Sequence, residues 1–185
     1  MHMKILTFST SNHSNSINAA LASLAGEKFK SVYKPDADIE MLNINDFEMP
    51  IYSIDRETEG GVHQRARDFY GKIGEADGLI MSFAEYNGSY TSAWKNIYDW
   101  MSRINQKVYQ DTPAVVLAAT PGPRSGASVL QAVEMTAPFF GLELCGVVGV
   151  GEWGKAFDPS TKSLTREEDV AKLDEALAAL AGKVG

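Results

Sequence analysis

Cysteine is almost absent from this sequence, since Cys145 is the only one in 185 residues. One cysteine excludes a disulfide scaffold, a dithiol redox pair and a zinc–thiolate cluster. Its apolar surroundings predict that Cys145 is a small buried core residue. Basic residues are also few, with 17 Lys and Arg against 24 Asp and Glu, a net charge of -7 and a pI of about 5.0. This acidic balance argues against nucleic acid as a partner.

Long hydrophobic runs are missing as well. No apolar run approaches the roughly 20 residues that a membrane-spanning helix needs, so we expect no membrane partner. The chain does not open with a charged and then apolar leader, which does not support secretion. Together with the acidic charge and the lone cysteine, this predicts a cytoplasmic protein. The length of 185 residues predicts one domain, residues 1–185, large enough to bury a core.

The glycine-rich phosphate-binding patterns are absent, both the dinucleotide fingerprint and the P-loop with its lysine. In their place, residues 8–18 read Phe-Ser-Thr-Ser-Asn-His-Ser-Asn-Ser-Ile-Asn, between an apolar run and a segment with helical periodicity. The first amides of a helix lack partners and carry partial positive charge, so hydroxyl and amide side chains there can surround a phosphate. The alternative is that Ser14 or Asn15 merely caps the helix. One cap needs one such residue and this loop has seven, which favours phosphate.

Apolar runs alternate with helical periodicity along the whole chain. We expect strands at 3–8, 39–44, 78–83, 113–119 and 142–150, and helices at 17–29, 62–73, 93–104, 127–139 and 170–180. This order predicts an α/β fold with a doubly wound, five-stranded parallel sheet and helices on both faces. Residues 45–61 are expected to be irregular. Thr165 and Glu168 have the spacing of a capping box for the last helix.

The loops after the first, third and fourth strands are the richest in polar residues and glycine. Ligands of such sheets bind beyond the carboxyl ends of the strands, where these three loops meet. In a five-stranded doubly wound sheet, a hydroxyl-rich first loop suits the phosphate of a flavin mononucleotide.

The loop after the third strand points to a particular family of flavin-binding proteins. Its sequence Ala84-Glu-Tyr-Asn-Gly-Ser resembles the Pro-Glu-Tyr-Asn-Gly-Ser signature of the NADPH-dependent FMN reductase family. That family includes quinone, azo-dye and chromate reductases. The following Lys95-Asn96, Asp99-Trp100 and Ser102-Arg103 also match its helix pattern. The first loop is similar to the family's Gly-Ser-x-Arg-x-x-Ser-x-Asn, and the resemblance runs from Lys4 through the last helix. It implies a flavodoxin-like fold.

Three residues depart from the family pattern: Thr10 replaces Gly, His13 replaces Arg and Ala84 replaces Pro. Arginine is always charged and grips phosphate with two hydrogen bonds. Histidine is charged only near or below pH 6.5, so we expect flavin affinity to weaken as rising pH removes the proton from His13. The alternative is that His13 is a solvent-facing loop residue.

The resemblance implies where FMN binds. The phosphate would lie among residues of the first loop: Ser9, Ser11, His13, Ser16, Ile17 through its amide, and Asn18. The isoalloxazine would lie against the third-strand loop (Glu85, Tyr86, Asn87 and Gly88) and the fourth-strand loop (Thr120, Pro121, Gly122 and Arg124). The alternatives are that Asn87-Gly88 is an ordinary turn and that Arg124 is a solvated surface residue. We expect no catalytic side chain and no metal ligand.

The expected function is an FMN-dependent NAD(P)H oxidoreductase, which transfers hydride through bound FMN to a quinone, an azo compound, a metal ion or free flavin. The electron donor is NADPH or NADH. The alternatives are a flavodoxin-type electron carrier and a flavin-binding regulatory module without turnover. The resemblance implies a homodimer or homotetramer. Aromatics at helical spacing are usually core residues, but Trp94, Tyr98 and Trp100 on one helix exceed what a single buried stripe hides. We therefore expect some of these three to face a partner subunit. Lys95 and Asp99 are expected to pair.

Overall fold

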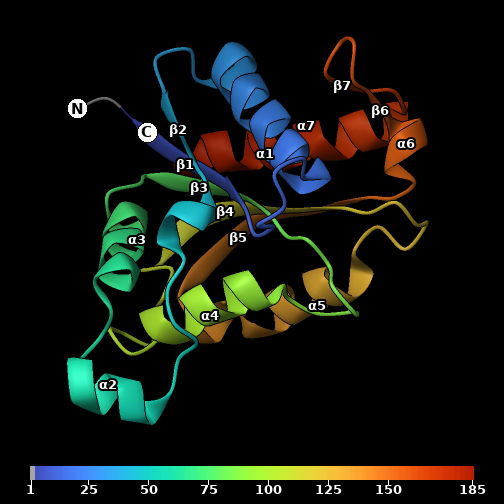
Figure 1. Cartoon of the computed structure of the whole chain (residues 1–185). Coiled ribbons are helices and arrows are strands. Elements are labelled where there is room, and N and C mark those ends of the chain that lie inside the picture. Colours follow the sequence, from blue (N-terminus) through green and yellow to red (C-terminus); the bar gives the residue numbers. More distant parts are fainter. Residues whose placement is uncertain (1–2) are drawn as a thin grey trace.

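The computed structural model describes residues 3–185 and is built on a five-stranded parallel sheet (Figure 1). Its strand order is β2-β1-β3-β4-β5. Because the chain passes from β1 to β2 on one side and returns to β3 on the other, the order reverses between β1 and β3. Ser9 and Ser82 are paired at the carboxyl ends of these two strands. The strands are β1 (Lys4–Ser9), β2 (Asp38–Leu42), β3 (Gly78–Ser82), β4 (Thr112–Ala119) and β5 (Leu142–Val150).

Helices cover both faces of the sheet, as the sequence predicts. α1 (Ile17–Lys28) and α7 (Glu167–Lys183) pack on one face. α3 (Gln64–Gly74), α4 (Ser92–Met101) and α5 (Ala127–Thr136) pack on the other. All five residues of β3 are buried, which explains its continuously apolar sequence. The flavodoxin-like, doubly wound α/β prediction is confirmed.

The stretch 45–61 is not irregular throughout, contrary to expectation. It contains the end of a 3-10 turn (Ile44–Phe47) and the short helix α2 (Ile54–Gly60), which is capped by the Ser53 hydroxyl. All residues of α2 are at least partly exposed, so the helix has no apolar stripe that a sequence pattern could reveal. Glu57 fixes α2 to the body by accepting hydrogen bonds from the Tyr52 hydroxyl (2.8 Å) and from Arg103 Nε (2.9 Å).

Other short elements also lie outside the expected pattern. The segment Phe29–Tyr33, which directly follows α1, forms a π-helical turn. The segment Ala137–Phe139 forms a 3-10 turn after α5. Between β5 and α7 lie the short helix α6 (Trp153–Ala156) and a hairpin of β6 (Phe157–Asp158) and β7 (Ser163–Leu164).

The capping box predicted for the last helix is wrong. α7 begins at Glu167 with Arg166 in the N-cap position, and the Thr165 hydroxyl donates instead to the Lys155 carbonyl at 2.8 Å. Packing of Thr165 against the end of α6 therefore takes precedence over local capping. Arg166 Nε donates to the buried carboxylate of Asp169 at 2.5 Å, which stabilises this first turn.

The prediction that aromatics of α4 face a partner subunit is also wrong. Trp94, Tyr98 and Trp100 are 0%, 8% and 2% exposed within the single chain. The segment before α2 covers the outer edge of the helix, where the Trp100 indole N–H donates to the Pro50 carbonyl at 2.8 Å and the Tyr52 ring packs edge-on at 5.1 Å. The chain thus hides all three aromatics by itself.

Two smaller predictions have different outcomes. Lys95 Nζ and Asp99 Oδ1 pair at 2.6 Å, as expected. Cys145 is half-buried rather than buried, because it lies on the edge strand β5 and only borders the core. Within residues 3–185, no helix has the length and apolar character needed to cross a membrane.

Candidate functional site

The loop after β1 is shaped by its own polar side chains. Ser9 Oγ accepts from the Ser11 amide (3.1 Å), Ser11 Oγ from the His13 amide (3.2 Å) and His13 Nδ1 from the Asn15 amide (3.0 Å). Each acceptor serves the amide two residues further on, the geometry in which Asx and Ser/Thr side chains make turns. The hydroxyl-rich sequence therefore winds the chain tightly toward the start of α1.

Helix α1 starts with a cap from Ser16, not from Ser14 or Asn15. Ser16 Oγ accepts from the Ala19 amide at 3.2 Å. Within residues 3–185, the amides of Ile17 and Asn18 have no acceptor, as expected for the first turn of a helix. These two N–H groups, together with the dipole of a 12-residue helix, are available to an anion.

The Asn18 side chain has a structural role that the sequence did not indicate. It is 3% exposed, and its Oδ1 accepts from the Ala119 amide and the Ser82 hydroxyl, both at 2.8 Å. Its Nδ2 donates to the Ala119 carbonyl at 3.0 Å. The amide group thus joins α1 to the carboxyl ends of β3 and β4, and only the backbone N–H of Asn18 is left for a ligand.

Thr10, where the family pattern has Gly, is fully buried and joins the first loop to the third-strand loop. Its Oγ1 accepts from the Ala84 amide at 3.0 Å, and its carbonyl accepts from the Thr91 hydroxyl at 2.6 Å. Two of the three departures, Thr10 and Ala84, therefore contact each other directly. They preserve the juxtaposition of the two loops.

The loop after β3 ends in a tight turn. Tyr86 and Ser89 exchange backbone hydrogen bonds of 3.0 and 3.1 Å, and Asn87 and Gly88 have φ values of 53° and 74°. Two positive φ values in a two-residue connection are the mark of a type I′ turn, which explains the Asn-Gly sequence. The turn presents the ring of Tyr86, which is 47% exposed.

The loop after β4 is attached to the start of α6. The Glu152 amide donates to the Gly122 carbonyl at 2.9 Å, and the Trp153 amide donates to the Thr120 carbonyl at 3.1 Å. Arg124 is exposed, and its Nη2 donates to Ser128 Oγ at 2.9 Å. The backbone of this loop is thus held near the other two loops, while Arg124 points at its own helix.

These three loops enclose a cavity of about 220 Å³. It is smaller than the 300–1,000 Å³ of typical ligand pockets, so a large ligand would project from it. Its lining includes most of the residues that the sequence predicted to contact FMN. Asn15, Ala84 and Ala119 also line it, although the sequence did not predict that they contact FMN. The predicted residues that line it are Ser11, His13, Ser16, Ile17, Asn18, Glu85, Tyr86, Thr120 and Pro121.

The remaining predicted residues lie outside this cavity. Ser9 lines an adjacent hollow of about 330 Å³, together with Ser11, His13 and the segment after β2. The other four residues shape the loops without lining either space: Asn87, Gly88, Gly122 and Arg124. These four residues were assigned to the ring by the family resemblance, which identifies loop positions but not the direction of a side chain.

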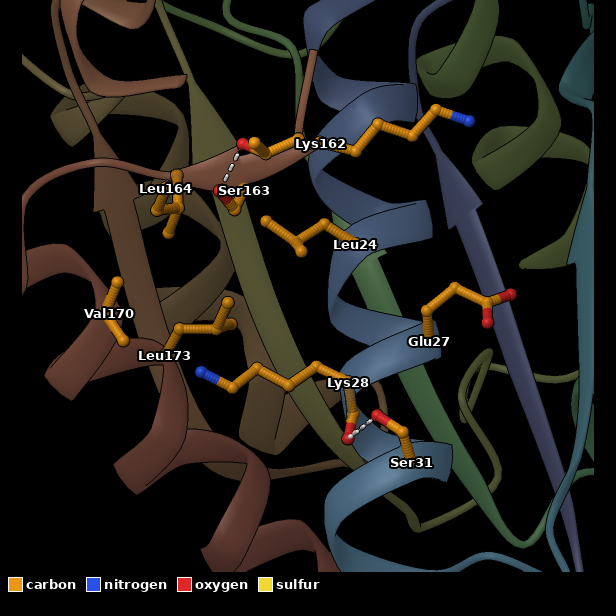
Figure 2. Close-up of a pocket in the computed structure, with 10 residues that line it drawn as sticks. Leu24, Glu27, Lys28, Ser31, Lys162, Ser163, Leu164, Val170 and Leu173 are labelled. Carbon is orange, nitrogen blue, oxygen red and sulfur yellow. Dashed lines mark hydrogen bonds between the residues drawn. The ribbon is translucent and has the colours of Figure 1, made fainter. Parts of the chain in front are cut away.

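A larger hollow of about 470 Å³ lies along the C-terminal half of α1, bordered by the β6–β7 hairpin and α7 (Figure 2). Leu24, Leu164 and Leu173 supply apolar side chains to its lining, and Lys28, which also lines it, is paired with Asp174 at 2.6 Å. It lacks the unpartnered helix amides of the loop cavity. The cavity at the carboxyl ends of the strands is therefore the better candidate for an anionic ligand.

The loop cavity has few positively charged side chains in its lining. Among its described lining residues, only His13 can carry a positive charge, so the hydroxyls and the amides of α1 must bind any anion. Within residues 3–185, no group of three His, Cys, Asp or Glu side chains is placed to hold a metal ion.

Comparison with known proteins identifies the family of this chain. The family model described as NADPH-dependent FMN reductase matches residues 3–152. An NAD(P)H-dependent FMN reductase of Pseudomonas aeruginosa is 32% identical over 120 residues, 65% of this chain and 61% of that protein. An NADPH:quinone oxidoreductase of Arabidopsis thaliana is 33% identical over 94 residues, 51% of this chain and 46% of that protein. The chain thus matches less than two thirds of the length of either relative.

The fold also has close structural counterparts. The flavoenzyme NAD(P)H:(acceptor) oxidoreductase FerB from Paracoccus denitrificans superposes with a TM-score of 0.76 at 21% identity, over 97% of this chain and 96% of that one. At that identity the likeness establishes the flavodoxin-like fold. The activity is indicated by the family match.

Proposed function

This chain is an oxidoreductase of the NADPH-dependent FMN reductase family, and we propose that it binds FMN between its three loops and passes electrons from NADPH or NADH to a small-molecule acceptor. The observation that carries the proposal is the convergence at one cavity of the unpartnered Ile17 and Asn18 amides with the Ser11 and Ser16 hydroxyls. These groups suit the phosphate of FMN.

The other walls of the cavity suit the ring. Tyr86 offers an exposed aromatic surface on one loop, and Thr120 and Pro121 offer a stiff backbone on another. When bound, FMN would supply the redox chemistry, accepting hydride from the nicotinamide and reducing the second substrate. The protein would orient the ring and leave its outer face open to both reactants.

The proposal also covers the small molecule that accepts electrons from the flavin. A quinone is the first acceptor to test, because the Arabidopsis relative is named as an NADPH:quinone oxidoreductase. Azo compounds, metal ions and free flavin are the other acceptors to test. A homodimer or homotetramer is also proposed. Because α4 hides its own aromatics, this proposal rests on the family alone.

An anaerobic absorbance spectrum tests the function directly. FMN is added to the purified protein, followed by NADPH or NADH, and the flavin band is followed in time. Rapid bleaching to the two-electron reduced form supports the reductase. FMN that binds but stays oxidised with both nucleotides points to an electron carrier or a regulatory module. Failure to bind FMN would overturn the proposal.

FMN binding is expected to be up to about fivefold tighter at low pH than at high pH, the factor that about 1 kcal/mol supplies. His13 lines the cavity, and a positively charged imidazole there would attract the phosphate by about 1 kcal/mol at contact. Only the charged ring supplies this attraction, so the affinity should fall as the pH rises. Fluorescence titration of FMN at several pH values measures the effect.

The matched control is His13→Asn, because asparagine keeps an acceptor for the Asn15 amide and carries no charge. The ionisation of FMN itself is the same for both proteins and cancels in the comparison. The His13→Asn variant should show the smaller dependence on pH. Parallel profiles for the two proteins would contradict a charged role for His13.

A further inference from the structure

Glu85 caps a helix that belongs to a different loop. Its Oε2 accepts from the amides of Ser128 and Val129, each at 3.0 Å, in the first turn of α5. The two residues lie 43 and 44 positions further along the chain. Helices α1, α2 and α4, by contrast, are each capped by the Ser or Thr that directly precedes them. The cap of α5 thus joins two loops that both contribute to the cavity.

The reason for this cap lies in the residue before α5. The N-cap position is Gly126, which has no side chain and a φ of 71°. A Cβ added there would lie only 2.5 Å from the Cβ of Ala118. A capping Ser, Thr or Asp does not fit in this space. The carboxylate from the third-strand loop supplies the missing acceptor and a charge that complements the helix dipole.

The cap also fixes the turn that follows Glu85. A Cβ at Gly88 would meet Ser128 at 3.9 Å, so the Tyr86–Ser89 turn rests on the first turn of α5. Glu85 is half-buried and lines the cavity. Within residues 3–185, no Lys, Arg or His forms an ion pair with its carboxylate, and the donors to it are the two first-turn amides of α5.

We propose that Glu85 is a positioning residue that holds the Tyr86–Ser89 turn against α5 and sets the balance between oxidised and reduced FMN with its charge. This rests on the proposed function. Two-electron reduction places negative charge on the isoalloxazine, and a carboxylate in the cavity wall opposes that charge. Glu85 therefore keeps the reduced flavin a strong donor, which favours transfer of electrons to the acceptor.

Two variants separate the cap from the charge. Glu85→Gln retains an oxygen that accepts from both amides but removes the charge. Glu85→Ala removes both. The matched control is Glu134→Gln, which makes the same change of charge at an exposed position further along α5. Each protein is studied by denaturant unfolding without flavin, by FMN titration, and by measurement of the potential of bound FMN.

The cap predicts that Glu85→Ala lowers the folding equilibrium constant about fivefold, the usual effect of losing a helix cap. It also predicts that binding of oxidised FMN weakens about tenfold, because the Tyr86–Ser89 turn is no longer held in place. Glu85→Gln should stay within about twofold of wild type in both measurements. If Glu85→Ala matches Glu134→Gln in unfolding and in FMN affinity, the positioning role is overturned.

The charge predicts that Glu85→Gln increases the affinity for reduced FMN, relative to that for oxidised FMN, about threefold to tenfold. A tenfold change in this ratio raises the two-electron potential of bound FMN by about 30 mV. A shift no larger than that of Glu134→Gln overturns the electrostatic role. Wild-type protein that binds no FMN overturns the proposed function, and the flavin part of this inference with it. The unfolding comparison still decides whether Glu85 caps α5.

Discussion

Replacing Asn18 with alanine is expected to destabilise the flavin-free protein by about 3–5 kcal/mol. The substitution removes three hydrogen bonds and leaves the Ser82 hydroxyl and both backbone groups of Ala119 unpaired in the interior. An unsatisfied buried polar group costs about 1–3 kcal/mol. The total is a large part of the 5–15 kcal/mol that stabilises a typical domain.

Urea unfolding measures this loss as a decrease in the midpoint at constant slope. Asn12→Ala is the matched control, because Asn12 is an exposed asparagine of the same loop, and it should change stability by less than about 0.5 kcal/mol. FMN affinity should fall with Asn18→Ala as well, since the side chain anchors the turn that carries the Ile17 amide. A loss below about 1 kcal/mol would show that the interior rearranges to pair these groups.

Gly126→Ala is expected to destabilise the protein by about 2–5 kcal/mol. The φ of 71° costs an L-residue about 1–2 kcal/mol, and the new methyl group would lie 2.5 Å from the Cβ of Ala118, a fully buried residue of β4. Since neither the strand nor the start of α5 is free to move, the strain is shared between them. FMN binding should weaken, because the displaced helix turn also carries the amides that Glu85 caps.

Gly122→Ala provides the control in the same loop. An added Cβ at Gly122 meets no described atom within 4 Å, and its φ is not in the left-handed region. Calorimetry should therefore show a clear decrease in melting temperature for Gly126→Ala and almost none for Gly122→Ala. Equal melting temperatures for the two variants would contradict the tight packing of α5 against β4.

The sequence alone specified the fold class and the location of the candidate site. Strands such as β3 have continuous apolar runs because both of their faces are buried, and the long helices have apolar stripes because one face is buried. These periodicities are local, so they can be recognised without knowing what lies across the core. The polar loops then follow from topology, since parallel strands bring their carboxyl ends to one edge.

Only the tertiary structure decided what individual side chains do at that edge. Asn18 was expected to surround a phosphate, but its amide group binds Ala119, 101 residues away. Glu85 was expected to lie against a flavin ring, but its carboxylate also caps α5. Some of the aromatics of α4 were expected to face a partner subunit, but the single chain buries all three, and the segment at Pro50 covers Trp100. Each outcome depends on a partner distant in sequence, and a hydrogen bond or a covered ring is specified by the position of that partner, which no local pattern contains.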